Sequence, residues 1–171
     1  MNEPTDGVVI LTLFRSTDVA EMCKADADAE LRKRFDFPPD FKPSLGHSAN
    51  VLARWDAERV AGTRFPFAVR SAVTGELLGG CELRPTRASV ANVSYWTYPP
   101  HRGGGVATRA VRLICELAHG ELAIETLEAE IDSENVPSRK VAVASGFVEA
   151  GERNNRALYV RLRSPVHPRP N

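Results

Sequence analysis

Cysteine is scarce in this sequence, because the 171 residues include only Cys23, Cys81 and Cys115. The number is odd and no C-x-x-C spacing occurs, so the sequence indicates neither a disulfide framework nor a zinc site. The four histidines are also scattered without the spacing of metal ligands. We therefore expect no bound metal, and the unpaired cysteines favour a reducing, cytoplasmic location.

The sequence also lacks an excess of charge of either sign. Lysine plus arginine and aspartate plus glutamate each number 22, so the formal net charge at pH 7 is zero. A protein without net charge has no overall field to attract nucleic acid or an anionic bilayer. We expect no nucleic-acid partner, and any anionic ligand must be bound by local groups.

Long hydrophobic runs are missing as well. No apolar segment approaches the roughly 20 residues that span a bilayer. The first residues, MNEPTDG, are acidic and lack the basic region of a secretion signal. We expect neither secretion nor membrane insertion, and no membrane partner.

The residues that are present are typical of one folded domain. Hydrophobic residues make up 43% and charged residues 26% of the sequence, which is ordinary for a globular protein. A chain of this length has room for a single core. We expect one domain over residues 1–163 and a disordered tail, SPVHPRPN, over residues 164–171.

The first third of the sequence predicts a strand followed by helices. Residues 8–14, VVILTLF, are typical of a strand, and Ser16 is placed to cap a helix that follows it. Residues 35–48 are rich in proline and predict a loop, and residues 49–61 predict a further helix. Three phenylalanines of the loop either pin it to the core or form the wall of an acceptor site: Phe35, Phe37 and Phe41.

From Phe65 onward the hydrophobic pattern changes to the alternation typical of strands. Residues 65–72 and 77–85 predict a hairpin, and residues 89–98 predict a third antiparallel strand. The rest of the chain predicts helix 106–120, strand 126–132, helix 135–146 and strands 147–152 and 156–163. This order places the chain in the α+β (α/β) class.

The segment YPPHRGGGVA, residues 98–107, is the most informative part of the sequence. A strand ends there, three glycines follow and a helix begins, so unhindered backbone N–H groups converge at the positive end of a helix. This arrangement suits a phosphate group, and Arg102 adds a charged donor. A glycine-rich turn without a ligand is the alternative interpretation. The P-loop and the G-x-G-x-x-G signature are both absent.

The same segment contains the pattern R-x-x-G-x-A, from Arg102 to Ala107. In this pattern the chain resembles the GCN5-related N-acetyltransferase (GNAT) superfamily, and within it the branch of the ribosomal-protein alanine and serine N-acetyltransferases. Further likeness lies in YW before the turn, N-x-x-S from Asn135 to Ser138, and SGF at residues 145–147. The resemblance extends over residues 8–163 and implies a mixed, mostly antiparallel sheet of six to seven strands, splayed between strands 4 and 5.

The resemblance implies that acetyl-CoA binds as the acyl donor. In this family the pantetheine arm pairs with the fourth strand, and the pyrophosphate lies on the amides of the turn, with an arginine and a hydroxyl alongside. A family asparagine bonds the pantetheine. The matching residues are Trp96, Thr97, Tyr98, Arg102, Gly103, Gly104, Gly105, Val106, Ala107, Thr108, Asn135 and Ser138. The 3′-phosphate is within reach of Arg109, Arg112 or Lys140, each of which is equally well interpreted as a solvated helix charge.

The implied reaction is direct attack of an amine on the thioester within a ternary complex. Ser138 matches the serine proposed to protonate the departing thiolate, and its alternative role is that of an ordinary helix serine. A backbone N–H near Tyr98 is the expected donor to the oxyanion. Glu130 is our candidate base, with Glu82 as the alternative. Ala142 stands where other family members carry a general-acid tyrosine.

The acceptor is expected opposite the CoA, against residues 26–55 and 152–158. These residues show no cluster of acids that would attract a polycation, which favours a peptide N-terminus or an uncharged or acidic small amine. Of these we expect a protein or peptide N-terminal α-amine. The alternatives are a small-molecule amine, such as an antibiotic, an amino-acid derivative or a polyamine, and a CoA-binding module without turnover. A homodimer is possible by analogy with related proteins.

Overall fold

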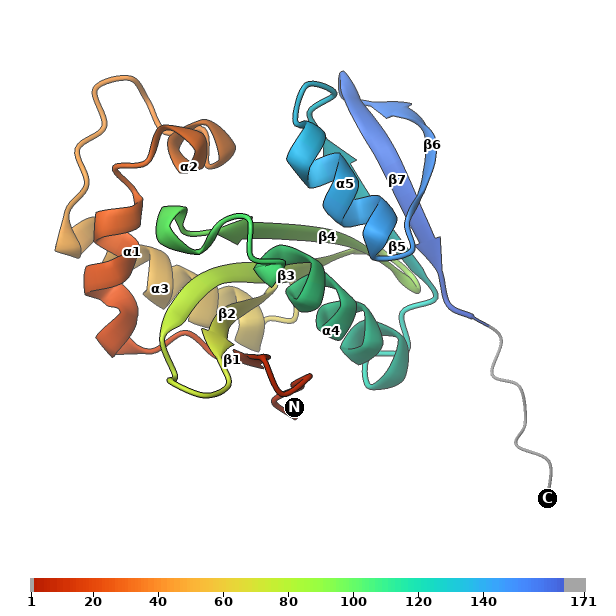
Figure 1. Ribbon diagram of the computed structural model, residues 1–171, viewed down its shortest axis with the longest axis horizontal. Coiled ribbons are helices and arrows are strands. Elements are labelled where there is room, and N and C mark those ends of the chain that lie inside the picture. Colours follow the sequence, from red (N-terminus) through yellow and green to blue (C-terminus); the bar gives the residue numbers. More distant parts are fainter. Residues whose placement is uncertain (1, 165–171) are drawn as a thin grey trace.

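A seven-stranded sheet forms the centre of the computed structural model, which describes residues 2–164 (Figure 1). Its strands are β1 (Val9–Thr12), β2 (Phe65–Ser71), β3 (Leu77–Arg87), β4 (Val90–Thr97), β5 (Thr126–Ile131), β6 (Val148–Arg153) and β7 (Arg156–Leu162). They are arranged in the order β1-β2-β3-β4-β5-β7-β6. Every neighbouring pair is antiparallel except β4 and β5, which are parallel. The predicted fold class and the mostly antiparallel sheet are confirmed.

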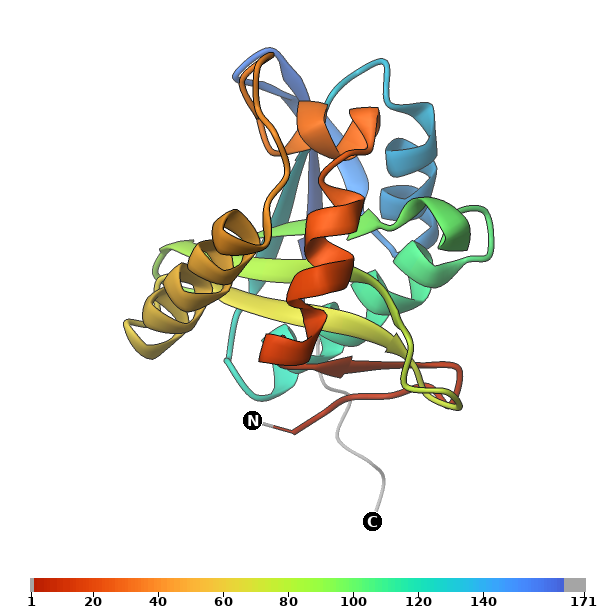
Figure 2. The same cartoon turned by 90° about the vertical axis from the view of Figure 1, so that its left-hand side faces the viewer.

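Helices cover both faces of this sheet. On one face lie α1 (Val19–Ala25), α2 (Ala29–Arg34) and α3 (Leu45–Val60), and on the other lie α4 (Val106–Gly120) and α5 (Val136–Ala144). The 3-10 turns η1 (Ser16–Asp18) and η2 (Pro99–His101) precede α1 and α4. Figure 2 shows α1 crossing in front of the strands, with α4 behind them. The apolar face of α4 packs on β1, β3 and β4.

The parallel pairing of β4 with β5 is short. It joins Val90, Ala91 and Asn92 to Thr126, Leu127 and Glu128. Beyond Asn92, β4 remains paired with β3 up to Thr97, while β5 continues alongside β7. The two strands therefore diverge, as Figure 1 shows, and the predicted splay between strands 4 and 5 is present.

Two glycines of β3 give Trp96 of β4 the room it occupies. Gly79 lies opposite Thr97, and Gly80 lies opposite Trp96. A Cβ atom on Gly80 would overlap the Trp96 ring, and one on Gly79 would overlap its backbone carbonyl. The ring packs instead against Phe14 and Trp55 in the core beneath α1 and α3. These glycines therefore set how closely β3 approaches the end of β4.

The N-terminal helices differ from the prediction in their bounds. The single helix expected after Ser16 is divided into η1, α1 and α2. Ser16 does not cap it, because Ser16 lies within η1 and the residue that precedes α1 is buried Asp18. The Asp18 carboxylate makes no cap bond to α1; it accepts from the Arg15 amide at 2.7 Å and pairs with Arg70. Asp28 starts a new helix by accepting from the Leu31 amide at 3.0 Å. Short-range capping therefore overrides the continuous helical pattern.

The predicted loop over residues 35–48 is shorter than expected. Ser44 Oγ accepts a hydrogen bond from the His47 amide at 3.1 Å, and α3 begins at Leu45 rather than at residue 49. The tail predicted over residues 164–171 lies outside the described residues, apart from Ser164. In residues 2–164, none of the helices combines the length and the apolar character needed to cross a membrane.

Candidate active site

A cavity of about 370 Å³ opens where β4 and β5 diverge. It is bounded by the last residues of α2, by β3, β4 and β5, by the first turn of α5 and by the start of β7. Its lining consists of Arg34, Phe35, Glu82, Arg84, Thr86, Asn92, Val93, Ser94, Tyr95, Ala129, Glu130, Ile131, Ser138 and Arg156. Two residues expected to take part in catalysis, Glu130 and Ser138, therefore lie on one cavity.

The glycine turn lies between η2 and α4, close to the end of β4. Gly103 and Gly105 have positive φ angles of 78° and 77°, which residues with a Cβ adopt only with strain. Gly105 is the residue that precedes α4. A Cβ on Gly104 would meet only the His101 carbonyl oxygen, at 3.9 Å. The turn therefore leaves open space above Gly104, next to the positive end of a helix of 15 residues.

Arg102 at the start of this turn is bound to acidic groups of α2. Its Nη2 lies 2.6 Å from Asp28 Oδ1 and its Nη1 lies 3.2 Å from Glu30 Oε2, while its Nε donates to the Thr97 carbonyl at 3.2 Å. The hydrogen bond to Arg102 lowers the pKa of Asp28, and the same bond raises the pKa of Arg102. Arg102 therefore remains charged, and its charge is partly balanced by the carboxylates of Asp28 and Glu30.

Asn135 and Ser138 form the start of α5. Asn135 Oδ1 accepts a hydrogen bond from the Ser138 amide at 3.1 Å. Ser138 Oγ donates to the Tyr95 phenol oxygen at 3.0 Å, and the phenol donates to the Ser138 carbonyl at 2.8 Å. Burial raises the pKa of Tyr95, so the phenol stays protonated. Tyr95 lines the cavity, and the sequence analysis gave it no role beyond its place in a predicted strand.

The end of β4 presents its backbone, not its aromatic side chains, to the gap. Trp96 and Tyr98 are buried in the core beneath α1 and α3. The Tyr98 amide donates to the Leu78 carbonyl of β3 at 2.9 Å, so it is not available to an oxyanion, and the expectation for Tyr98 is wrong. Because successive N–H groups of a strand point in opposite directions, the Thr97 amide faces the open edge instead.

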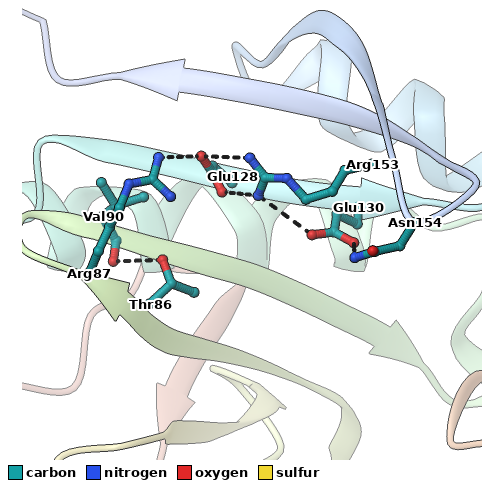
Figure 3. A network of polar contacts seen from close by, with 7 residues as sticks. All are labelled: Thr86, Arg87, Val90, Glu128, Glu130, Arg153 and Asn154. Carbon is teal, nitrogen blue, oxygen red and sulfur yellow. Dashed lines mark hydrogen bonds and ion pairs between the residues drawn. The ribbon is translucent and has the colours of Figure 1, made fainter.

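Glu130 lies on the cavity with 21% of its side chain exposed. Its Oε2 accepts from Asn154 Nδ2 at 3.1 Å, and its Oε1 lies 3.6 Å from Arg153 Nη1 (Figure 3). Arg153 ends β6, and Asn154 lies in the turn between β6 and β7. The carboxylate is therefore oriented by this hairpin and remains accessible from the cavity.

Glu128, two residues earlier, is buried. It accepts from Arg153 at 2.5 Å and from Arg87 at 2.9 Å, as Figure 3 shows. The hydrogen bond from Arg153 is the main reason that the pKa of Glu128 is lowered. The sequence analysis did not single out this residue, because period-two alternation does not reveal that two arginines cover that face of the strand.

Glu82, the alternative base, has its oxygens occupied. One oxygen accepts from Arg64 Nε at 2.7 Å, and the other accepts from Ser94 Oγ at 3.1 Å and lies 2.7 Å from Arg84 Nη2. The side chain is 1% exposed. These contacts favour Glu82 as a fixed part of the cavity wall and leave Glu130 as the more accessible carboxylate.

The three phenylalanines of the predicted loop have different environments. Phe35 lines the cavity and packs edge-on against Trp96, with 5.3 Å between ring centroids. Phe37 and Phe41 stack on each other at 4.1 Å, and both contact the His47 ring. Phe35 therefore both lines the cavity and packs against the core, whereas Phe37 and Phe41 pack on each other and on His47 of α3.

The cationic residues considered for a 3′-phosphate are engaged in other contacts or exposed. Arg109 lies 2.6 Å from Asp6, Arg112 donates to the Ala144 carbonyl at 2.7 Å, and Lys140 is exposed. A metal site is not formed either, since among residues 2–164 no three His, Cys, Asp or Glu side chains group closely enough to hold an ion. The cavity therefore carries a hydroxyl, Ser138, and a carboxylate, Glu130, and the glycine turn follows the end of β4.

Comparison with known families gives one match over most of the chain. Residues 9–148 match the family described as Acetyltransferase (GNAT) domain. No curated protein matches the chain.

Solved structures show the same fold. Mycobacterium smegmatis RimJ in complex with CoA-disulfide has a TM-score of 0.77 at 22% identity over 91% of this chain and 82% of that chain. RimL, the ribosomal L7/L12 alpha-N-protein acetyltransferase in complex with coenzyme A, has 0.78 at 14% identity over 93% and 96%. The microcin C7 self immunity acetyltransferase MccE, in complex with acetyl-CoA and AMP, has 0.74 at 14% identity over 93% and 94%.

Proposed function

This chain belongs to the GNAT acetyltransferase family and is an acetyl-CoA-dependent N-acetyltransferase, and we propose that its acceptor is the N-terminal α-amine of a protein or peptide. The observation that carries the proposal is the cavity between β4 and β5, on which Glu130 and Ser138 both lie. The structural likeness to RimJ and RimL supports this acceptor class, because RimL is described as acting on a protein α-amine.

The glycine turn fits a pyrophosphate. The space above Gly104, which a Cβ would fill, allows an anion to approach the amides of Gly103, Gly104, Gly105, Val106 and Ala107. Thr108, half-buried in the first turn of α4, adds a hydroxyl. The Arg102 guanidinium, which pairs with Asp28 at the start of α2, would also pair with the phosphate of the ligand. These residues would hold the donor, which supplies an activated acetyl thioester when bound.

The open edge of β4 is suited to the pantetheine arm and to the developing oxyanion. The backbone of Trp96, Thr97 and Tyr98 forms this edge, and the Thr97 amide is the N–H that it directs away from β3. A preorganised amide donor of this kind stabilises a tetrahedral oxyanion in acyl transfer. Asn135 lies across the gap, where it holds the start of α5.

Proton transfer is assigned to the two groups on the cavity. The carboxylate of Glu130 accepts a proton from the incoming ammonium group, directly or through water, so that the nitrogen can form the new C–N bond. The Ser138 hydroxyl donates a proton to the sulfur as the C–S bond breaks. Tyr95, hydrogen-bonded to Ser138, orients this hydroxyl, and the serine regains its proton from solvent.

A small-molecule amine is the second candidate acceptor. The volume of the cavity, about 370 Å³, is in the range of ligand pockets. MccE, whose structure holds acetyl-CoA and AMP, shares the fold. A CoA-release assay with acetyl-CoA and a panel of peptides and small amines separates the candidates. Release with peptides alone supports the proposal, release with small amines alone contradicts it, and acetyl-CoA binding without release for any acceptor indicates a module without turnover.

A further inference from the structure

The cavity is lined by more arginine than acid. Arg34 ends α2, Arg84 lies on β3 and Arg156 begins β7, so three separate elements bring a guanidinium to one space. The acids on the same lining are Glu82 and Glu130. Side chains from elements far apart in the sequence meet here only because the fold brings them together.

Both acids make their close contacts with arginines other than Arg34 and Arg156. Glu82 is paired with Arg64 and with Arg84. Glu130 lies 3.6 Å from Arg153, which also pairs with Glu128. Neither carboxylate forms an ion pair with Arg34 or Arg156.

Arg34 and Arg156 are the cavity cations that lack a carboxylate partner. Across residues 2–164, no ion pair within 4.0 Å involves either side chain. Arg34 donates to Ser94 Oγ at 2.6 Å, and its guanidinium lies 5.4 Å from the centre of the Trp96 ring. The aromatic contact and the single hydrogen bond hold this guanidinium in place while leaving further N–H groups for a ligand.

We propose that the acceptor carries an anionic group, a carboxylate or a phosphate, which Arg34 and Arg156 bind while the amine lies at Glu130. Planar guanidinium groups bind both oxyanions with paired hydrogen bonds. An anion also relieves the repulsion between cations gathered on one partly enclosed surface. In a peptide this group is an acidic side chain close to the N-terminal residue, and in a small amine it is the molecule's own carboxylate or phosphate.

This inference rests on the proposed acetyl transfer, and it is tested by acceptors that differ only in charge. Peptides beginning Ser-Glu-Glu, Ser-Gln-Gln and Ser-Lys-Lys, with identical remaining residues, are compared by initial rates of CoA release. The small-acceptor arm compares serine, serine amide and phosphoethanolamine. We expect kcat/KM to be about tenfold higher for the acidic peptide than for the neutral one, and higher still relative to the basic one. If the small anionic amines are preferred to the acidic peptide, the anionic group is the carboxylate or phosphate of a small-molecule acceptor and not an acidic side chain of a peptide.

The variants Arg34→Gln and Arg156→Gln test the two residues. Each should raise KM for the acidic peptide about tenfold and leave the neutral peptide within about twofold. Arg54→Gln is the matched control, because Arg54 is exposed on α3 and is not part of the cavity lining. Thermal unfolding of each variant confirms that it is folded. If KM for both peptides changes equally, Arg34 and Arg156 do not bind the anion.

Failure of this inference and failure of the proposed function give different results. Equal use of acidic, neutral and basic acceptors by the unaltered protein contradicts the anion site and leaves acetyl transfer intact. If no acceptor releases CoA, calorimetric titration of the same peptides into the CoA-loaded protein still tests the site. Tighter binding of the acidic peptide, lost in Arg156→Gln, supports the anion site, and equal binding of all three peptides overturns it.

Discussion

Arg102 and Asp28 join the glycine turn to α2 through a 2.6 Å contact between guanidinium and carboxylate. Asp28 also accepts from the Leu31 amide at 3.0 Å and so caps α2. One carboxylate thus starts a helix on the acceptor side and neutralises the arginine of the proposed pyrophosphate site. Binding of the donor and placement of α2 are therefore physically connected.

Replacing Asp28 with asparagine should tighten acetyl-CoA binding about threefold, because the amide keeps the helix cap but no longer competes with phosphate for the Arg102 charge. Isothermal titration of acetyl-CoA measures the effect. Asp40→Asn, at an exposed loop residue, is the control for removing one negative charge. Weaker binding by Asp28→Asn would show instead that Asp28 positions Arg102 for the phosphate.

Gly104→Val should lower acetyl-CoA affinity by about a hundredfold, because its side chain would fill the space above the turn. The nearest atom of the protein to a Cβ there is 3.9 Å away, so unfolding temperature should be almost unchanged. A second variant, Gly105→Val, adds an effect on stability. Gly105 has a φ of 77°, so the valine variant should lose about 1–2 kcal/mol of stability in addition to affinity. Unaltered affinity in Gly104→Val would remove the turn as the pyrophosphate site.

Ser138→Ala should reduce kcat and leave the Kd for acetyl-CoA within about twofold, since the hydroxyl acts on the leaving thiolate. Tyr95→Phe should reduce kcat to a smaller extent, because it removes the phenol that orients Ser138 but leaves the hydroxyl itself. The double variant should be no slower than Ser138→Ala, as residues acting through one another are not additive. Additive losses would show that Tyr95 acts independently.

Glu130→Gln should lower kcat about a hundredfold, the range expected for loss of a general base, without weakening acetyl-CoA binding. Glutamine can still accept from Asn154 Nδ2, so the hairpin contact is kept. Single-turnover rates with a saturating peptide measure the chemical step. If Glu130→Gln turns over at the unaltered rate, proton removal belongs to solvent or to another group.

The sequence predicts the parts of this site that depend on local pattern. The glycine turn and the start of α5 both follow from neighbouring residues, and the structure has both. The burial along β4 alternates only in part, because Tyr95 and Trp96 are both buried. What was missed depends on long-range packing. Tyr95 meets Ser138 across 43 positions in the chain, and Arg102 meets Asp28 across 74. No spacing within a single segment indicates such pairs.

The error at Tyr98 has the same physical origin. Sequence alternation distinguishes the two faces of a strand, but it does not show to which neighbouring strand each N–H points. That direction depends on the register with β3, where the Tyr98 amide meets the Leu78 carbonyl. A shift of one residue in register exchanges the bonded and the open amides, and this is why the open amide is that of Thr97 and not that of Tyr98.

Glu128 should make stability depend on pH in acid. Its pKa is lowered in the folded protein, chiefly by the hydrogen bond from Arg153 and further by the bond from Arg87, so the folded state favours the ionised form. The stabilisation is therefore fully present above the ordinary pKa of glutamate and is lost as the pH falls through the lowered value.

Glu128→Gln should cost about 2 kcal/mol near neutral pH, because it weakens two charge-assisted hydrogen bonds at a buried position. The difference from the unaltered protein should shrink as the pH drops below the ordinary glutamate range, since protonation then removes the same charge from both. Urea unfolding at a series of pH values measures it, with Glu121→Gln at an exposed residue as control. A difference that stays constant with pH would mean that Glu128 stabilises the β4–β5 junction by packing and not by its charge.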